Sequence, residues 1–181
     1  YDKFAEYADR RGYIMAREGY AGIQRYPYIF AGDWPSGSGN VPGREGWFYM
    51  ESLIRGGMNI GLAGVGYWGH CMGGFEGDAT DELYIRWTQF GMLSPIAHLF
   101  GTDHSYEEKD DKEPWHYSDQ AENLFRKYDR LRYRLVPYIY SLCWEMQKTG
   151  EPLMRAPVLD YQNDPKTYSL DDQYLFGPNL L

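Results

Sequence analysis

The sequence predicts an α/β fold with a parallel sheet, followed by an all-β segment. Between residues 13 and 149, short apolar runs lack alternation, and amphipathic stretches separate the later ones. This pattern is typical of strands covered on both faces. After Gly150 the apolar runs become shorter and are spaced by Asp, Asn, Pro and Gly, as in an all-β unit. We therefore expect two domains, at residues 1–150 and 151–181.

Four apolar runs are the candidate strands. A helical pattern at residues 1–12 precedes them, because Phe4, Tyr7 and Ala8 share one face and Gly12 can end a helix. The runs then lie at residues 13–16, 26–31, 64–68 and 94–99. Since strand–helix–strand connections are right-handed, this order predicts one parallel sheet with helices packed against it.

Three amphipathic stretches are the candidate helices, at residues 45–60, 80–92 and about 118–149. In the longest stretch one apolar stripe recurs at spacings of three and four: Leu124, Tyr128, Leu131, Leu135, Tyr138, Leu142 and Met146. Pro137 is expected to kink or interrupt this helix, because proline lacks a backbone donor. Gly150 and Pro152 are expected to end it.

Composition excludes several classes of protein. The 181 residues contain no apolar stretch of about 18 residues, so no transmembrane helix is expected within them. A net charge of −8 argues against nucleic acid as a partner. Two cysteines exclude a disulfide framework and a four-cysteine zinc site, and the histidines lack zinc spacing. No metal or organic cofactor is implied, whereas the oligomeric state and the compartment stay open.

Aromatic residues make up 18% of the chain. Aromatic faces stack on the C–H faces of sugar rings, so this excess suits a carbohydrate partner. A large core filled by aromatic side chains explains the same number, and composition alone favours that explanation.

Polar residues gather where the predicted strands end. In parallel α/β folds these ends meet at one crevice, and here they carry Arg17, Asp33, His70 with Cys71, and residues 100–103. Asp33 is the strongest candidate, because it lies between Gly32 and Trp34. A carboxyl group beside an indole can stay protonated and donate a proton. The alternative is an aspartate that caps a loop.

Arg17 and Cys71, two other residues at strand ends, each fit two interpretations. Arg17 could clamp an anion or sugar hydroxyls, or it could form a buried ion pair. Cys71 could be a nucleophile, but no residue pattern orients a base toward it, so a small buried thiol fits better.

The ends of the sequence suggest a piece of a longer protein. There is no initiator Met, and the first residues already read as a helix. The last residues, QYLFGPNLL, read as a strand and turn without a polar tail. We therefore expect both ends to be cut from a longer chain.

Seven segments, in order along the chain, resemble glycoside hydrolase family 31. They are REGYAGIQRYPYIFAGDW (17–34), SLIRGGMNIGLAGVGYWGHCMGGFEG (52–77), RWTQFGMLSPIAHLFGTD (86–103), KEPW (112–115), RLRYRLVPYIYSL (130–142), TGEPLMRAP (149–157) and DDQYLFGPNLL (171–181). The YWGH and LFGTD neighbourhoods look most like the bacterial α-xylosidase branch. Since a whole barrel needs ~250 residues, the resemblance implies the second part of a (β/α)₈ TIM barrel, then the start of a β-sandwich domain.

The resemblance also implies a retaining hydrolase of terminal α-linked sugars that uses two carboxylates. Asp33 matches the acid/base of the family, and Arg17 matches its sugar-binding arginine. The family's nucleophile lies on an earlier strand that this chain does not contain, so the chain alone is expected to be inactive. The expected substrate-binding residues are Arg17, Phe30, Trp34, Trp68, Cys71, His98 and Phe100.

Two departures from the family pattern fall in the expected sugar pocket. Cys71 stands where relatives have the Asp of Asp-Ile-Gly-Gly-Phe, and Phe100 stands where they usually have a His. His98 or His104 could substitute for the latter. The default substrate is a terminal α-glucoside or α-xyloside. The alternatives are an α-galactoside or α-N-acetylgalactosaminide hydrolase and, in another class, a glycan-binding homologue without activity.

Overall fold

The computed structural model describes residues 2–10, 12, 14–19, 21–26, 28–36, 46–101 and 112–180. Its centre, within these residues, is a parallel three-stranded sheet in the order β1 (Ile29–Phe30), β2 (Trp68–Cys71), β3 (Ile96–His98). The register pairs Ile29 with Trp68 and Gly69 with Ile96. Ala16 adds a parallel bridge to Ile29, so the first predicted run also meets this sheet. The predicted parallel sheet is confirmed.

The third predicted run, at residues 64–68, overlaps β2 at Trp68 alone, so its bounds were wrong. Gly64 adopts a φ of 83°, and the Val65 N–H donates to the Ile60 carbonyl at 3.1 Å. These residues therefore close the preceding helix. The strand continues instead through Gly69 to Cys71, where glycine and histidine break the apolar pattern.

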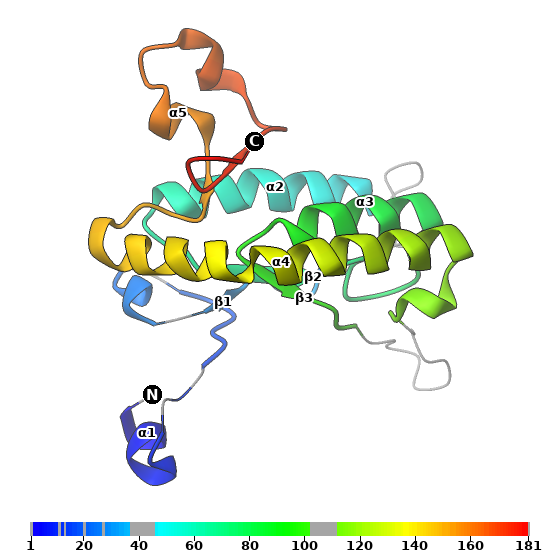
Figure 1. Ribbon diagram of the computed structural model, residues 1–181, viewed down its shortest axis with the longest axis horizontal. Coiled ribbons are helices and arrows are strands. Elements are labelled where there is room, and N and C mark those ends of the chain that lie inside the picture. Colours follow the sequence, from blue (N-terminus) through cyan, green and yellow to red (C-terminus); the bar gives the residue numbers. More distant parts are fainter. Residues whose placement is uncertain are drawn as a thin grey trace.

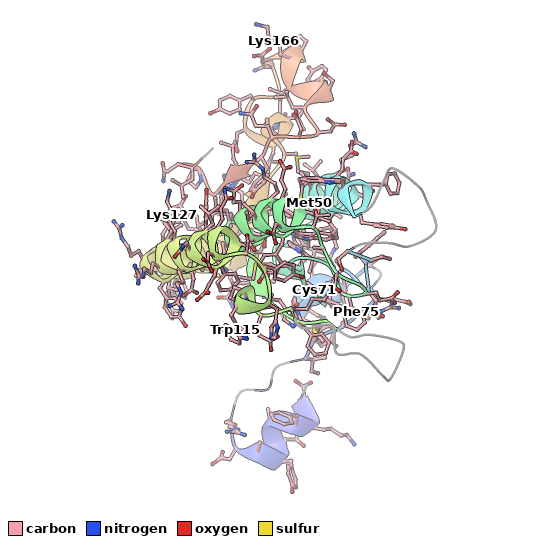
Figure 2. The ribbon with its side chains drawn as sticks, turned by 90° about the vertical axis from the view of Figure 1, so that its right-hand side faces the viewer. Met50, Cys71, Phe75, Trp115, Lys127 and Lys166 are labelled. Atoms are coloured by element: carbon pink, nitrogen blue, oxygen red, sulfur yellow. The ribbon has the colours of Figure 1, made fainter. Side chains whose placement is uncertain are left out.

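Helices α2 (Trp47–Leu62), α3 (Asp81–Met92) and α4 (Asp119–Thr149) follow the three strands in turn. The hydroxyl oxygens of Thr80 and Ser118 cap α3 and α4, because each accepts the N–H of the residue three positions later. Figure 1 shows these helices on one side of the sheet, with α3 packed along α4. Helix α1 (Asp2–Ala8) lies apart from them in both Figure 1 and Figure 2.

Pro137 does not interrupt α4, which runs unbroken from Asp119 to Thr149. The carbonyl that loses its partner belongs to Tyr133, four residues earlier, and Tyr133 is 73% exposed, so water can reach this side of the helix. Gly150 ends α4 as predicted, with a φ of 81° and its N–H on the Met146 carbonyl. None of the helices in the described ranges is long and apolar enough to cross a membrane.

Beyond Gly150, β4 (Met154–Arg155) pairs antiparallel with β5 (Leu175–Phe176). This pairing agrees with the predicted change to all-β structure. Between the two strands lie two unpredicted helical turns, α5 (Pro157–Asp160) and η3 (Pro165–Ser169), and each begins at a proline. Two further short turns are η1 (Ile23–Arg25) and η2 (Pro114–His116).

Side chains along the strands alternate between two faces of the sheet. Ile29 and Trp68 belong to the main core, together with Leu53 of α2 and Trp87 of α3. The opposite face buries a second cluster of Tyr28, Phe30 and Cys71, with Phe75 and Ile96 packed against it. In a barrel this second face looks toward the axis, so residues at its carboxyl end are positioned for function.

Candidate active site

Asp33 and Arg17 form a charge pair at the carboxyl end of the sheet. Asp33 follows β1 through Gly32, whose φ of 100° turns the chain, and Arg17 directly follows the bridge residue Ala16. Arg17 Nη2 donates to Asp33 Oδ2 at 3.2 Å. Both side chains stay accessible, with 58% of Arg17 and 36% of Asp33 exposed. The pair can therefore meet a ligand at this edge.

Cys71 ends β2 beside this pair and is 3% exposed. Burial, as the larger cause, and the negative charge of Asp33 together raise the pKa of its thiol to about 12, although the positive charge of Lys112 opposes the shift. The thiol is therefore neutral at physiological pH. This state matches the expectation of a small buried thiol and argues against a nucleophile.

His98 and Phe100, at and after the end of β3, form an aromatic wall together with Phe30 of β1. The Phe30 ring meets His98 edge-on at 6.0 Å, and His98 stacks on Phe100 at 5.5 Å with an interplanar angle of 11°. Phe100 is 53% exposed, so the stack opens to solvent. Burial lowers the pKa of His98, which favours the neutral ring. His104, the other candidate, lies outside the described residues.

Phe75 joins this wall, although the sequence did not single it out as a site residue. Its ring lies 5.5 Å from that of Phe100, and Figure 2 shows it close to Cys71. Gly73 and Gly74 have φ values of 79° and 87°, so the chain turns sharply and returns Phe75 to the sheet. In the sequence, the two adjacent glycines before Phe75 indicate such a sharp turn and could have identified Phe75 as a site residue.

Trp34 and Trp68, two of the expected substrate-binding residues, are not brought to this wall. The Trp34 indole N–H donates to the Ala31 carbonyl at 2.7 Å, and its ring packs on Tyr49 of α2 at 5.5 Å. Trp68 is 3% exposed and lies against Gly57 of α2. Both line a cavity of about 180 Å³ between the strands and α2, on the helix side of the sheet.

His70, which also ends a predicted strand, faces the helix layer as well. Its Nδ1 accepts the Trp87 indole N–H at 3.1 Å, and its ring stacks on Phe90 at 4.5 Å. Successive side chains of a strand point to opposite faces, so Cys71 and His70 cannot serve one site. No cluster of metal-ligating side chains occurs among the described residues.

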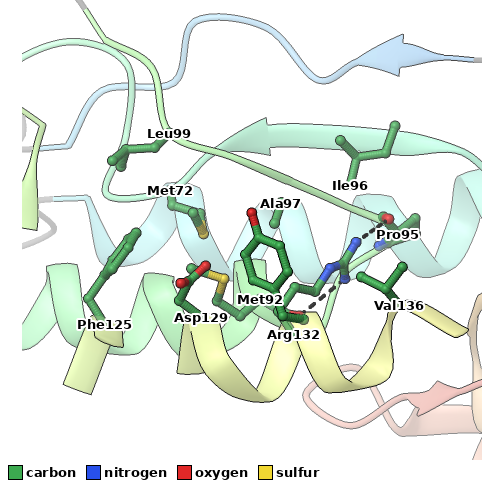
Figure 3. Close-up of a pocket in the computed structure, with 11 residues that line it drawn as sticks. Met72, Met92, Pro95, Ile96, Ala97, Leu99, Phe125, Asp129, Arg132 and Val136 are labelled. Atoms are coloured by element: carbon green, nitrogen blue, oxygen red, sulfur yellow. Dashed lines mark hydrogen bonds between the residues drawn. The ribbon is translucent and has the colours of Figure 1, made fainter. Parts of the chain in front are cut away.

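A larger cavity, of about 470 Å³, lies away from Asp33 between β3 and helices α3 and α4 (Figure 3). Its walls are mainly apolar, with Asp129 and Arg132 as the charged members. The Arg132 guanidinium donates to the carbonyls of Met92, Ser94 and Pro95, so it closes the carboxyl end of α3. Arg132 therefore stabilises the end of α3.

Functional side chains gathered at the carboxyl end of a parallel α/β sheet, as Asp33 and Arg17 are here, are typical of TIM-barrel enzymes. The TIM-barrel domain of glycosyl hydrolases family 31 matches residues 1–142, and the C-terminal domain of that family matches residues 150–181. The chain belongs to glycosyl hydrolase family 31, so the predicted family and fold are confirmed.

Curated relatives carry the names of two activities. The chain is 36% identical to an α-xylosidase of Saccharolobus solfataricus, over 96% of this chain and 23% of the relative. It is 34% identical to α-glucosidase 2 of Bacillus thermoamyloliquefaciens, over 95% of this chain and 20% of the relative. The chain thus spans less than a quarter of the length of either relative.

Solved structures agree with this assignment. A Flavobacterium johnsoniae dextranase of the family, complexed with glucose, superposes with a TM-score of 0.83 at 33% identity, over 98% of this chain and 22% of that one. A family 31 α-xylosidase from a soil metagenome, complexed with xylose, gives a TM-score of 0.83 at 27% identity, over 98% and 28%.

Proposed function

We propose that this chain supplies the acid/base and part of the sugar pocket of a retaining exo-α-glycosidase. The observation that carries the proposal is the Asp33–Arg17 pair, held at 3.2 Å at the carboxyl end of a family 31 barrel sheet. Residues 1–150 are the proposed barrel portion, and residues 151–181 are the proposed start of the next domain.

Asp33 is the group that protonates the leaving oxygen. A retaining mechanism also needs a second carboxylate, roughly 5–5.5 Å from the first, which attacks the anomeric carbon. We infer that this nucleophile comes from an earlier strand outside this chain. In the second half-reaction Asp33 takes a proton from water, and the water releases the sugar.

The proposed pocket residues are Arg17, Phe30, Cys71, His98 and Phe100. The guanidinium of Arg17 has donors beyond the one that Asp33 accepts, and these can bind sugar hydroxyls. Phe30, His98 and Phe100 form a continuous row of ring contacts, edge-on between the first two and stacked between the last two, which can pack against a sugar face. We leave Trp34 and Trp68 out of this pocket because their rings pack on the helix side.

A terminal α-glucoside or α-xyloside is the proposed default substrate, in line with the names of the relatives. A galacto-configured sugar, including α-N-acetylgalactosaminide, is the second candidate. The observation that favours it is the apolar wall at Cys71 and Phe100, where the family pattern has polar groups. An inactive glycan-binding protein is the candidate from another class.

The test is a panel of aryl α-glycosides of glucose, xylose, galactose and N-acetylgalactosamine, assayed with the full-length protein that carries this chain. We expect hydrolysis of at least one substrate with retention of the anomeric configuration, followed by NMR. If sugars bind but none is hydrolysed, the protein is the glycan-binding homologue and the enzymatic proposal is wrong.

A further inference from the structure

Lys112 is a buried cation near the site that the mechanism above does not use. Its side chain is 4% exposed. Its carbonyl accepts the Tyr84 hydroxyl at 2.9 Å, and the Tyr84 ring stacks on Tyr117 at 3.9 Å. Helix α3 and the segment before α4 therefore fix the backbone from which the ammonium group extends.

The ammonium group joins two loops. Lys112 Nζ donates to Ser36 Oγ at 3.0 Å and also to the carbonyl of Gly77. Ser36 Oγ in turn contacts the carbonyls of Glu76, at 2.6 Å, and of Gly77. Ser36 lies in the loop after β1, whereas Glu76 and Gly77 lie in the loop after β2. One positive charge thus holds acceptors from both loops, and charge-assisted hydrogen bonds are the stronger kind.

Backbone hydrogen bonds run through the same junction. The Ser36 N–H donates to the Glu76 carbonyl at 2.7 Å, and the Phe75 N–H donates to the Trp34 carbonyl at 2.7 Å. Asp33 immediately precedes this paired segment. Only Trp34 and Pro35 separate Ser36 from Asp33, so a displacement of Ser36 would also shift Asp33.

The junction has little free space. A Cβ added to Gly74 would lie 2.4 Å from the Ser36 Cβ, and one added to Gly101 would lie 2.4 Å from the Lys112 Cε. Gly101 comes from the segment after β3, so loops from all three strands meet around Lys112. Its charge also reaches the pocket, since it lowers the pKa of Cys71 while Asp33 raises it.

We propose that Lys112 is a positioning residue that fixes the Asp33 segment relative to the loops after β2 and β3. The proposal rests on the proposed function of Asp33 as the general acid. Without the ammonium group, buried acceptors lose a donor and the junction relaxes. A shift of ~1 Å in a catalytic group can cost ~10²-fold in rate.

The test compares leaving groups in the full-length protein. Lys112→Met keeps the length of the side chain and removes its charge. We expect kcat/KM for an α-linked disaccharide, which needs the acid, to fall ~10–10²-fold. The value for the 2,4-dinitrophenyl glycoside of the same sugar, whose leaving group needs little protonation, should stay close to that of the wild type. The quantity compared is the ratio of kcat/KM for the disaccharide to kcat/KM for the dinitrophenyl glycoside. Both values come from the same variant, so a lower folded fraction cancels from the ratio.

Two further variants separate positioning from stability. Ser36→Ala removes one acceptor of the ammonium group without adding bulk, and it should change the same ratio in the same direction. Ser36→Ala also tests the proposal by itself if Lys112→Met fails to fold. Tyr138→Phe removes the hydrogen bond from the Tyr138 hydroxyl to the Phe176 carbonyl and touches none of the residues of this junction, so it should lower the Tm and leave the ratio unchanged.

The outcomes distinguish this inference from the proposed function. An unchanged ratio in both Lys112→Met and Ser36→Ala, with an active wild type, overturns the role of Lys112 alone. A changed ratio in Tyr138→Phe assigns the effect to general loosening and also overturns it. A wild type that hydrolyses no α-glycoside overturns the proposed function itself.

Discussion

At the scale of single residues, the accessibility of Asp33 matters as much as its partner. Its carboxyl group accepts a hydrogen bond from Arg17 and still exposes 36% of the side chain. The leaving oxygen of a glycoside can therefore approach it. A fully buried ion pair, which the sequence left open for Arg17, would block that approach, whereas the residues of this chain leave the pair open.

Asp33→Ala tests the proposed acid/base role of Asp33 in the full-length protein. Natural glycosides have poor leaving groups, so we expect their kcat/KM to fall ~10²–10⁴-fold, the usual range for general acid–base catalysis. Substrates with acidic phenols should lose far less in the glycosylation step. Azide should restore part of the turnover, because it attacks the intermediate without base assistance. Equal losses for all leaving groups, with no effect of azide, would exclude Asp33 as the acid/base.

Phe100 and Cys71 are expected to tune which sugar is accepted. A site that hydrogen-bonds a hydroxyl discriminates strongly, whereas a thiol and a phenyl ring do not. The exposed Phe100 ring can pack against an N-acetyl methyl group or an epimer. Phe100→His should therefore raise kcat/KM for the α-glucoside relative to the α-N-acetylgalactosaminide, measured with the aryl panel. An unchanged ranking, with the α-glucoside best in the wild type, would show that the two departures are neutral.

At the scale of elements, helix α2 meets the sheet through a glycine. A Cβ on Gly57 would lie 2.0 Å from the Trp68 ring, which is 3% exposed and enclosed by the core. A Cβ on the neighbouring Gly56 would meet nothing within 4 Å beyond the adjacent residues and backbone of its own helix. The two glycines thus share one helix and differ in what faces them.

This difference predicts opposite effects of one substitution. Gly57→Ala should destabilise the protein by ~1–3 kcal/mol, because the added methyl group overpacks the helix–sheet contact. Gly56→Ala should stabilise it by up to ~1 kcal/mol, because alanine favours the helix. Denaturant unfolding of the full-length variants measures both. Equal shifts in the two variants would mean that Trp68 does not set the distance between α2 and β2.

The same elements show how far the sequence could predict the site. Arg17, Asp33, His70, Cys71 and Phe100 were placed near one crevice because strand ends converge in parallel sheets, and the family resemblance added Phe30 and His98. His70 instead faces the helix layer. Trp34 and Trp68 were also predicted to bind substrate, whereas their rings pack on the helix side of the sheet. A two-residue strand such as β1 offers no alternation from which a face can be predicted, and β2 is buried throughout. Lys112 was missed because its role depends on loops that meet only in the folded chain.

At the scale of the whole molecule, the main core encloses a histidine. His70 is fully buried between β2 and α3, where Phe90 stacks on it and Trp87 donates to its Nδ1. Its Nε2 has no hydrogen-bond partner among the described residues. Burial is the main cause that lowers its pKa to about 3; the Cys71 backbone opposes this shift, and His98 contributes a smaller lowering. The folded protein therefore holds His70 neutral.

This burial predicts acid sensitivity of the whole fold. In the unfolded chain His70 binds a proton near its ordinary pKa of 6.5, while the folded chain resists protonation down to about 3. Its contribution to stability is therefore complete above pH 6.5 and is lost as the pH falls toward 3. The loss approaches ~1.4 kcal/mol per pH unit in that window. Urea midpoints of the full-length protein at pH 7.5 and 4.5 measure it.

His70→Gln provides the decisive comparison, because glutamine does not titrate and can still accept the Trp87 N–H. It should lower stability at pH 7.5 through lost packing, yet flatten the decline between pH 7.5 and 4.5 by ~2–3 kcal/mol. If His70→Gln keeps the slope of the wild type, other groups cause the acid sensitivity and the core tolerates a charged His70.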